Sequence, residues 1–308
     1  MRVCILGLAN PFQWTPHYVD AFRQRAEVIT VGPTFDESFL LTLQMLDRQH
    51  DIKQFDIQAE LDPNTKLKDL LPANWEPDLI VAVSDFGRQL CPDMDAYACP
   101  KAYISVDTWQ TVRDYLDAMH YDFVFAAQCA AVPGLQAVGC RNVHWLPLAC
   151  NPAVHHPVEV AQDYDLTFAG AIVPGVHDER KRLLDALTGK YNVHAIQRVY
   201  GDDFCRASLQ GKLAFNHAAM RELNLRIFEA LGMGCALLTN RESEDNGLLD
   251  LFQDGKHLLV YDNEAHLIEL VERYLYDDSA RRALAEAGRN EVLEKHTYLH
   301  RIDTLIDI

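Results

Sequence analysis

A carboxylate, a guanidinium and an amide lie close together near the start of one long apolar stretch. The stretch reads NLRIFEALGMGCALLTN from Asn224 to Asn240, and it contains Arg226 and Glu229. Asn is a favoured N-cap residue, so the pattern predicts a helix that begins at Asn224. The free N–H groups and positive dipole end of such a helix suit a diphosphate, and the Glu229 carboxylate suits a ribose diol. These residue types therefore indicate a nucleotide-sugar site.

A purely structural interpretation of the same residues stays open. Arg226 and Glu229 are three positions apart, so on a helix they can form an ordinary ion pair. Asn224 can serve only as the cap of its helix. Gly232 and Gly234 let the helix end abruptly, because glycine tolerates positive φ.

The first half of the chain alternates apolar strands with helical patterns. Nearly continuous apolar strands that are spaced by helices indicate a parallel sheet covered on both faces. A helix is expected over roughly 37–48. The predicted strands are RVCILGL, EVITVG, PDLIVAVSD, KAYISVD, YDFVFAAQ and NVHWLPL.

The segment ACNPAVHHPVEVAQDYD has no periodicity and is interpreted as a linker, in which His155 and His156 pack or bend. After it the alternation of strands and helices restarts, and the tail from Asp277 to Ile308 is helical. The fold class is therefore α/β, with two Rossmann-like doubly wound domains. The second set of predicted strands is DLTFAGA, YNVHAIQR, KLAFN, CALLTN and KHLLVYD.

Four motifs in the second half of the chain resemble those of the CgeB-like (spore-maturation-type) glycosyltransferases, which belong to the retaining GT-B superfamily. They are the segment FAG…ERKRLLDAL from Phe168 to Leu187, the stretch described above, LFQDGKHLLVYD, and HTYLHR near the end. The resemblance implies a GT-B fold whose two domains face each other across a cleft. Residues 1–155 would bind the acceptor and residues 156–290 the donor. A C-terminal helix at about 291–308 would cross back onto the first domain.

The resemblance also implies an activity. A sugar would pass from a nucleotide-diphosphate sugar to an acceptor hydroxyl, with retention at the anomeric carbon, without a bound metal and without a cofactor. Partners would be the nucleotide sugar and a glycan, protein or small-molecule acceptor. Two alternatives stay open: another nucleotide-sugar enzyme on this fold, such as an epimerase or hydrolase, and a non-catalytic partner of a glycosylation complex.

Two donor-binding residues follow from the resemblance. Arg180 matches the arginine that opens a helix in the CgeB-like sequences, although the run ERKR also fits a solvated basic helix face. Glu229 matches the second of two glutamates that lie eight residues apart in the wider superfamily. The first would fall at Arg221, which is not acidic, although Glu222 is adjacent. This departure supports the non-catalytic alternative.

Other candidates follow predicted strands, because ligands of open α/β sheets bind beyond the carboxyl ends of the strands. Gly170 would let the backbone approach a phosphate. The side chains of Asn216, His217 and Thr239, with Asn240, would contact the donor or serve only as satisfied polar groups.

In the first domain, Gly7, Asn10 and His17 lie in or just after the loop that follows the first strand. Asp107, followed by Thr108, ends KAYISVD and can orient an acceptor hydroxyl or act as a base. It can equally cap a helix that begins near Trp109. Asp107 and His17 are the catalytic candidates.

In HTYLHR, the residues His296, Thr297 and Arg301 are expected to pack between domains.

Composition limits the possible partners. The 308 residues suffice for two domains, and 49% hydrophobic with 24% charged residues indicate a globular protein with real cores. The formal net charge of −17 argues against general nucleic-acid binding, whose footprint is basic, and against anionic membrane surfaces.

The eight cysteines are scattered without a C-x-x-C pair, which argues against a zinc site and for reduced, buried thiols. The N-terminus has no signal-peptide layout, and no apolar run reaches the length of a transmembrane segment. We therefore expect a cytoplasmic protein.

Overall fold

The chain divides into two compact units in the computed structural model. Unit 1 comprises Met1–Pro147 together with Ile302–Ile308, and unit 2 comprises Leu148–Arg301. The structure describes residues 1–10, 13–33, 37–42, 53–84, 90–108, 112–220, 222–241 and 243–308. None of the helices in these ranges is long and apolar enough to cross a bilayer.

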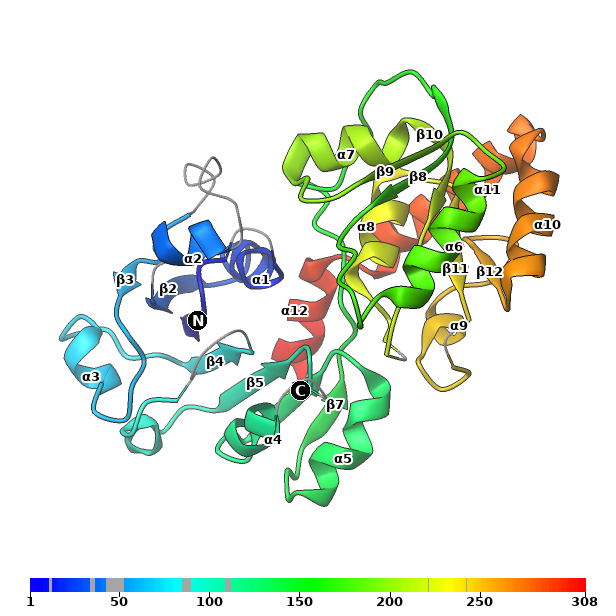
Figure 1. Ribbon diagram of the computed structural model, residues 1–308. Coiled ribbons are helices and arrows are strands. Elements are labelled where there is room, and N and C mark those ends of the chain that lie inside the picture. Colours follow the sequence, from blue (N-terminus) through cyan, green and yellow to red (C-terminus); the bar gives the residue numbers. More distant parts are fainter. Residues whose placement is uncertain are drawn as a thin grey trace. The chain divides into compact units, whose positions relative to one another are not determined.

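Unit 1 is built on a parallel sheet whose strands lie in the order β3-β2-β1-β4-β5-β6-β7 (Figure 1). The strands are β1 (Arg2–Leu6), β2 (Glu27–Gly32), β3 (Ile57–Gln58), β4 (Leu79–Val83), β5 (Lys101–Ser105), β6 (Phe123–Ala126) and β7 (Val143–Trp145). The described helices are α1 (Thr15–Phe22), α2 (Glu37–Thr42), α3 (Leu67–Leu70), α4 (Val112–Ala118) and α5 (Val132–Ala137), with 3-10 turns at Met94–Ala96 and Cys129–Ala131.

The middle of this sheet is buried on both faces. Every residue of β4 and of β5 is buried, as expected for parallel strands that are covered on both sides. Strands β1 and β2 approach closely at Gly32, where a Cβ atom would lie 2.0 Å from the Gly7 carbonyl oxygen. The absence of a side chain at Gly32 therefore lets the loop after β1 lie close to β2.

Unit 2 carries a second parallel sheet, in the order β12-β11-β10-β8-β9. Its strands are β8 (Tyr164–Ala169), β9 (Val193–Ile196), β10 (Gly211–Phe215), β11 (Leu237–Asn240) and β12 (Leu259–Tyr261). Its helices are α6 (Asp178–Thr188), α7 (Gly201–Leu209), α8 (Leu225–Met233), α9 (Leu248–Leu251), α10 (Glu264–Leu275) and α11 (Asp278–Lys295), and α12 (Tyr298–Asp307) follows.

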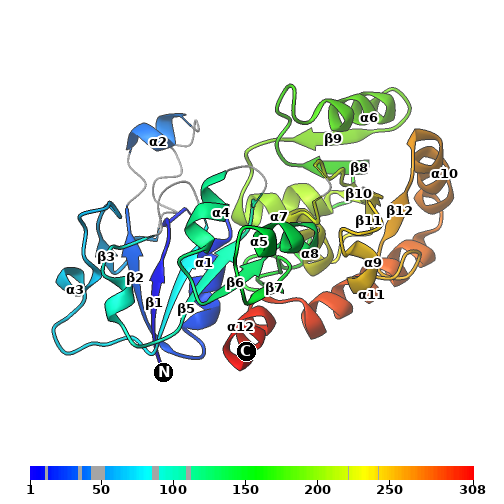
Figure 2. The same ribbon diagram turned by 90° about the horizontal axis from the view of Figure 1, so that it is seen from below.

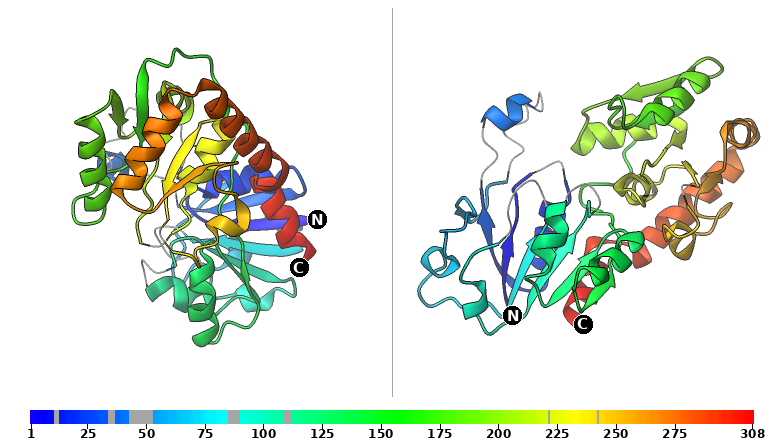
Figure 3. Two further views of the ribbon diagram at one scale, coloured as in Figure 1. Left: turned by 90° about the vertical axis from the view of Figure 1, so that its right-hand side faces the viewer. Right: turned by 60° about the horizontal axis from the view of Figure 1, so that its bottom comes forward.

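Helices cover both faces of this second sheet (Figures 2 and 3). Leucines of α6 and apolar residues of α10 share one core with β8, β10, β11 and β12. Helix α7 packs against β8 and β10, and α8 packs against β11. The loops that follow β8, β10, β11 and β12 lie along one edge of the sheet, because all these strands are parallel.

The α/β class and the two doubly wound units are confirmed, but the division between the units differs from the prediction. It falls between Pro147 and Leu148 rather than after residue 155. The reason is a backbone pairing inside unit 2: Cys150 N–H donates to His296 O at 2.9 Å, and Tyr298 N–H donates to Cys150 O at 3.0 Å. Arg301 also donates to Leu148 O at 3.1 Å.

The C-terminal helix also differs from the prediction. The predicted helix at about 291–308 is interrupted between α11 and α12, and only its end, Ile302–Ile308, belongs to unit 1. There Asp303 accepts a bidentate pair from Arg25, at 2.7 and 2.9 Å. The helix predicted over 37–48 is present as α2, and residues 43–48 lie outside the described ranges.

Candidate functional site

Two arginines flank the ring of Phe168 at the carboxyl end of β8. The Cζ atom of Arg180 lies 5.7 Å from the ring centroid and that of Arg226 lies 5.4 Å from it. Arg180 comes from the first turn of α6 and Arg226 from the first turn of α8. Two separate helix starts therefore bring two cations to one strand end, and a cation over an aromatic face is stabilised by the ring quadrupole.

The guanidinium of Arg226 has no carboxylate partner in the part of the chain that the structure describes. Its Nε is buried without a hydrogen bond, and the ion pair with Glu229 that the spacing allowed does not form. Burial lowers the pKa of Arg226, and the more distant charges of Glu229 and Glu222 offset part of that effect. An unpaired buried cation is costly, so this position favours an anionic ligand.

Arg180 is held firmly in a buried position. It is 3% exposed, its Nε donates to His217 O at 2.8 Å, and its Nη1 donates to Ala171 O at 2.7 Å. Burial, with the charge of Arg226, lowers its pKa to about 10, so it stays charged at neutral pH. The solvated helix face expected from the run ERKR is present, but Lys181 and Arg182 form it, not Arg180.

Gly170 lets the Arg226 guanidinium lie against the backbone after β8. A Cβ atom at this position would lie 2.2 Å from Arg226 Nη2, closer than van der Waals contact permits. The Gly170 N–H is already used, because it donates to Ile196 O at 3.0 Å. The glycine therefore makes room for the arginine. The close approach of a phosphate to this backbone, which the sequence predicted, stays a prediction.

The predicted start of α8 is confirmed, but the side chain of Asn224 does not cap the helix. Asn224 is the N-cap residue with extended backbone angles, φ −77 and ψ 156, and it makes no side-chain cap hydrogen bond. Its amide instead pairs with that of Asn216, at 3.1 and 3.2 Å. The side chain therefore leaves the first-turn N–H groups of α8 for another acceptor.

Asn216 and Thr239 are fully buried, so their side chains offer no surface to a ligand. Asn216 Nδ2 donates to Thr239 Oγ1 at 3.0 Å as well as to Asn224. This polar cluster ties the ends of β10 and β11 to the start of α8. Asn240 has a similar role, because its amide brackets the backbone of Ala218 at 2.7 and 3.1 Å.

The Glu229 carboxylate faces a histidine of the linker. His155 Nε2 lies 3.2 Å from Glu229 Oε1, and their side chains are 4% and 13% exposed. The sequence placed Glu229 in α8 correctly but assigned His155 only a packing or bending role. Because the two residues are far apart along the chain, only a contact prediction across the fold would have identified this pair. His156 lies 3.9 Å from Asp202 instead.

His217 follows β10 and is bound to Tyr261 of β12. Its Nδ1 lies 2.9 Å from the Tyr261 hydroxyl, and that hydroxyl donates to Asn216 O at 2.9 Å. Burial, helped by the charge of Arg180, lowers the pKa of His217 to about 4. The imidazole is therefore neutral at physiological pH.

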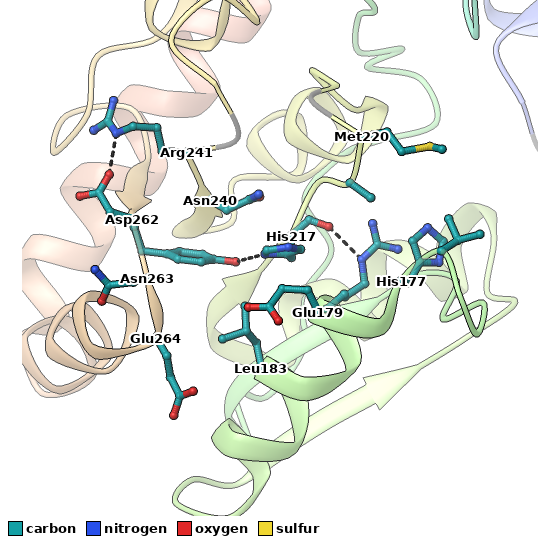
Figure 4. Close-up of a pocket in the computed structure, with 14 residues that line it drawn as sticks. His177, Glu179, Leu183, His217, Met220, Asn240, Arg241, Asp262, Asn263 and Glu264 are labelled. Carbon is teal, nitrogen blue, oxygen red and sulfur yellow. Dashed lines mark hydrogen bonds and ion pairs between the residues drawn. The ribbon is translucent and has the colours of Figure 1, made fainter. Parts of the chain in front are cut away.

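A cavity of about 360 Å³ lies beside His217, over the ends of β10, β11 and β12 (Figure 4). Arg180 forms one wall of it, so the cavity adjoins the two arginines. The lining residues are Val176, His177, Glu179, Arg180, Leu183, His217, Ala219, Met220, Asn240, Arg241, Tyr261, Asp262, Asn263 and Glu264. All of them belong to unit 2.

The two catalytic candidates of unit 1 follow different strands of its sheet, His17 after β1 and Asp107 after β5. His17 lies just after the loop that follows β1, in the first turn of α1, and it is 8% exposed. Asp107 follows β5, and burial together with the charge of Asp114 raises its pKa to about 6. Thr108 is bound to Ser105 at 2.7 Å. Trp109, near which Asp107 was predicted to cap a helix, lies outside the described residues. Arg221 lies outside them too.

Carboxylates with aspartate-x-aspartate spacing have structural partners. Asp93, two residues before Asp95, accepts from the N–H groups at the start of α3 at 2.7 and 3.0 Å. Asp165, two residues after Asp163, lies 3.2 Å from Lys212. Within the described ranges, no group of three or more His, Cys, Asp or Glu residues has the arrangement of a metal site.

The eight cysteines are free, and Cys99 and Cys129 are half-buried whereas the other six are buried.

The second half of the chain matches a known family. The family model described as "Glycosyl transferase-like" covers residues 153–307, which is half of the chain. No curated protein matches the chain significantly.

Solved structures with the same fold cover the whole chain. HepE from Anabaena, in complex with UDP-glucose, has a TM-score of 0.64 at 14% identity, with 100% of both chains covered. The sucrose-phosphate synthase of Thermosynechococcus elongatus has a TM-score of 0.60 at 11% identity, covering 100% of this chain and 98% of its own. A DNA-modifying β-glucosyltransferase has a TM-score of 0.58 at 11% identity, with 100% of both chains covered.

Proposed function

Because this chain belongs to the Glycosyl transferase-like family and has the GT-B fold, we propose that it transfers a sugar from a nucleotide-diphosphate sugar to an acceptor hydroxyl. One observation carries the proposal. Arg180 and Arg226 flank Phe168 beside the uncapped start of α8, and Arg226 has no carboxylate partner among the described residues. Two cations and free helix-terminal N–H groups form a site for a diphosphate.

In the proposed reaction, the bond between the anomeric carbon and the diphosphate oxygen breaks. The electron pair leaves with the nucleoside diphosphate, the acceptor hydroxyl oxygen bonds to the anomeric carbon, and the hydroxyl proton would pass to the Asp107 carboxylate. Arg180, Arg226 and the first-turn N–H groups of α8 would stabilise the negative charge that develops on the departing diphosphate. Because Arg180 is already fixed by two hydrogen bonds, it would need little rearrangement during the reaction.

The acceptor would bind to unit 1, and Asp107 would accept the hydrogen bond of its hydroxyl. A pKa of about 6 leaves this carboxyl ionised at pH 7 and close to the range that suits proton transfer. His17 would assist in positioning the acceptor.

We expect Asp107→Asn to lower kcat at least tenfold with little change in donor affinity, measured as initial rates against donor concentration. An unchanged kcat would remove Asp107 from the mechanism.

Finer features are part of the same proposal. We assign the chain to the CgeB-like group on its motifs, and we propose retention at the anomeric carbon, independence of metal ions and a cytoplasmic location. The anomeric configuration of the product, read by NMR, tests retention. Activity that is unchanged in excess EDTA supports metal independence, and activity that is restored only by a divalent ion contradicts it.

Nucleotide titration tests the diphosphate site. UDP, GDP, ADP and dTDP are titrated into the protein by calorimetry, and one of them should bind. Arg226→Gln should weaken that binding at least tenfold, because a charge-assisted contact to phosphate is lost. The control is Arg206→Gln, which changes an exposed arginine of α7 and should bind as the parent does. If no nucleotide binds, or if both variants match the parent, the diphosphate site is placed wrongly.

Turnover then separates transfer from its alternatives. The conjugate of glucose with the nucleotide that binds is incubated with and without candidate acceptors. Product that forms only with an acceptor supports transfer. Turnover without any acceptor would indicate a hydrolase, and a changed sugar on intact nucleotide would indicate an epimerase. Binding without turnover would favour the non-catalytic alternative.

A further inference from the structure

We propose that the cavity between α6 and α10 binds the sugar ring of the donor, and that this sugar is an uncharged, hydroxyl-rich pyranose rather than a uronic acid. The inference rests on the proposed function, because it places the diphosphate on the arginines beside the cavity. Arg180 both lines the cavity and flanks Phe168 with Arg226. The group attached to a diphosphate at that position would therefore adjoin the cavity.

The volume fits this occupant. About 360 Å³ lies near the lower end of the range of small-molecule sites, which is about 300–1,000 Å³. The cavity is formed by residues that are adjacent in the fold but distant in sequence: His177 before α6, His217 after β10, and Asp262 after β12 (Figure 4). It is too small for a polymer, and it is adequate for a single ring with its substituents.

Hydrogen bonds fix which nitrogen of His217 can meet a ligand. The single hydrogen of the Tyr261 hydroxyl goes to Asn216 O, so this hydroxyl must accept from His217 Nδ1–H. In the neutral ring Nε2 then carries a lone pair, and it can accept from a sugar hydroxyl.

His177 has the opposite tautomer. Its Nδ1 accepts from the Val173 N–H at 3.0 Å, so the neutral ring carries its hydrogen on Nε2. The cavity therefore contains one imidazole that accepts and one that donates. A sugar hydroxyl is itself both donor and acceptor, and it can use either.

The charged lining favours an uncharged ligand. Three carboxylates, those of Glu179, Asp262 and Glu264, line the cavity, against two guanidinium groups, those of Arg180 and Arg241. Asp262 is bound to Arg241 at 2.6 Å, and Arg182 lies between Glu179 and Glu264. The carboxylates keep further lone pairs for hydroxyl donors. A uronate carboxylate would add a like charge to this set.

Part of the cavity wall is aliphatic and exposed. Val176 is 48% and Met220 is 54% exposed, and both line the cavity. Met220 also has a left-handed backbone, φ 60, which is uncommon for a residue other than glycine. A pyranose presents C–H groups between its hydroxyls, so it can use an apolar wall together with the polar one.

Two substitutions of His217 test the assignment. Asn retains an amide nitrogen near the position of Nδ1, which keeps the contact with Tyr261, but it removes the acceptor at Nε2. Gln places an amide oxygen near the position of Nε2. Calorimetry measures the Kd of the free nucleoside diphosphate and of its glucose, galactose and glucuronate conjugates. The first probes are UDP, UDP-glucose, UDP-galactose and UDP-glucuronate, and they are replaced by the corresponding set if titration identifies another nucleotide.

His217→Asn should weaken at least one neutral conjugate about fivefold and leave the free diphosphate within about twofold, because one hydrogen bond is lost. His217→Gln should recover most of this loss. The parent should bind the glucuronate conjugate at least about tenfold more weakly than the best neutral one. His194→Asn, a change on β9 outside the cavity, is the control and should match the parent.

Two results overturn the inference while the proposed function stands. In the first, the free diphosphate binds with an affinity that depends on Arg226, but His217→Asn leaves the affinity of the sugar conjugates unchanged or lowers it no more than that of the free diphosphate. In the second, a glucuronate conjugate binds as tightly as the neutral ones. If no diphosphate binds to the parent, the proposed function fails and this inference fails with it. Melting temperatures of both variants, which should lie close to that of the parent, show that folding is intact.

Discussion

At the scale of single residues, the position of Arg226 depends on Gly170. A Cβ atom at Gly170 would lie 2.2 Å from Arg226 Nη2, so Gly170→Ala should push the guanidinium away from Phe168. We expect nucleoside-diphosphate affinity to fall about tenfold, measured by calorimetry. Gly189→Ala is the matched control, because its Cβ would have ordinary contacts at 3.6 Å. Equal affinities for the two variants would show that Arg226 does not hold the phosphate.

The pair formed by Glu229 and His155 gives a second residue-scale prediction. Glu229→Ala leaves a buried histidine without this partner, so we expect a loss of roughly 1–3 kcal/mol in the free energy of unfolding. Glu229→Gln keeps an acceptor for His155 Nε2 and should lose less. Both losses are read by urea unfolding, and a Glu229→Ala variant as stable as the parent would contradict a structural role for the pair.

Glu229 therefore differs from the expectation drawn from sequence alone. A carboxylate that served only the ribose would weaken nucleotide binding on removal and leave stability unchanged. The structure adds a partner from the linker, so binding and stability should both change. Nucleotide affinity of Glu229→Gln separates the two roles, because the ribose needs the ionised acceptor and His155 does not.

At the scale of elements, a buried amide cluster joins β10, β11 and α8. Asn216 binds both Asn224 and Thr239, so Asn216→Ala leaves two buried polar groups with one partner fewer. We expect this change to cost about 2 kcal/mol in the free energy of unfolding. Asn64→Ala, on an exposed loop, is the control and should cost less than about 0.5 kcal/mol. Equal stabilities would mean that the cluster does not hold these elements together.

The sequence predicted the elements well because their apolar periodicity is strong. The strands around β4 and β10 and the start of α8 at Asn224 are where the pattern placed them. Side-chain direction was not predictable in the same way. Asn224 was expected to cap its helix, but Asn216 offers a buried amide with two complementary groups, and that pairing replaces the cap.

The cavity beside His217 could not be predicted from the sequence either. Its lining comes from the ends of several strands, and the residue types Asp262, Asn263 and Glu264 resemble an ordinary helix start after β12. The rule that ligands bind at the carboxyl ends of parallel strands directed attention to the edge of the sheet where the cavity lies. Only the fold shows that α6 and α10 leave a space there.

At the scale of the whole molecule, the two units should respond differently to acid. Burial lowers the pKa values of His177, His217 and His296 in unit 2 to about 4. Between pH 6.5 and about 4 the unfolded chain binds more protons at these sites than the folded one, so their contribution to stability is lost as the pH falls. In unit 1 the raised pKa of Asp107 has the opposite sign, and its contribution is lost as the pH rises through about 6.

Hydrogen exchange read by mass spectrometry follows the two units separately. Peptides from β8, β10 and α8 should lose protection between pH 6.5 and 4.5 after correction for the intrinsic exchange rate. His217→Asn should reduce this loss, because one of the three titrating groups is gone. Unit 2 protection that stays constant over this interval would contradict the burial of the three imidazoles.

The central claim is that Arg180, Arg226 and the start of α8 hold a diphosphate. A crystal structure of the protein with UDP, or with whichever nucleoside diphosphate binds in solution, tests it most directly. We predict phosphate oxygens within hydrogen-bonding distance of the Arg226 guanidinium and of the first N–H groups of α8. A nucleotide bound elsewhere, with Arg226 still packed on Phe168 and no phosphate against it, would contradict the account.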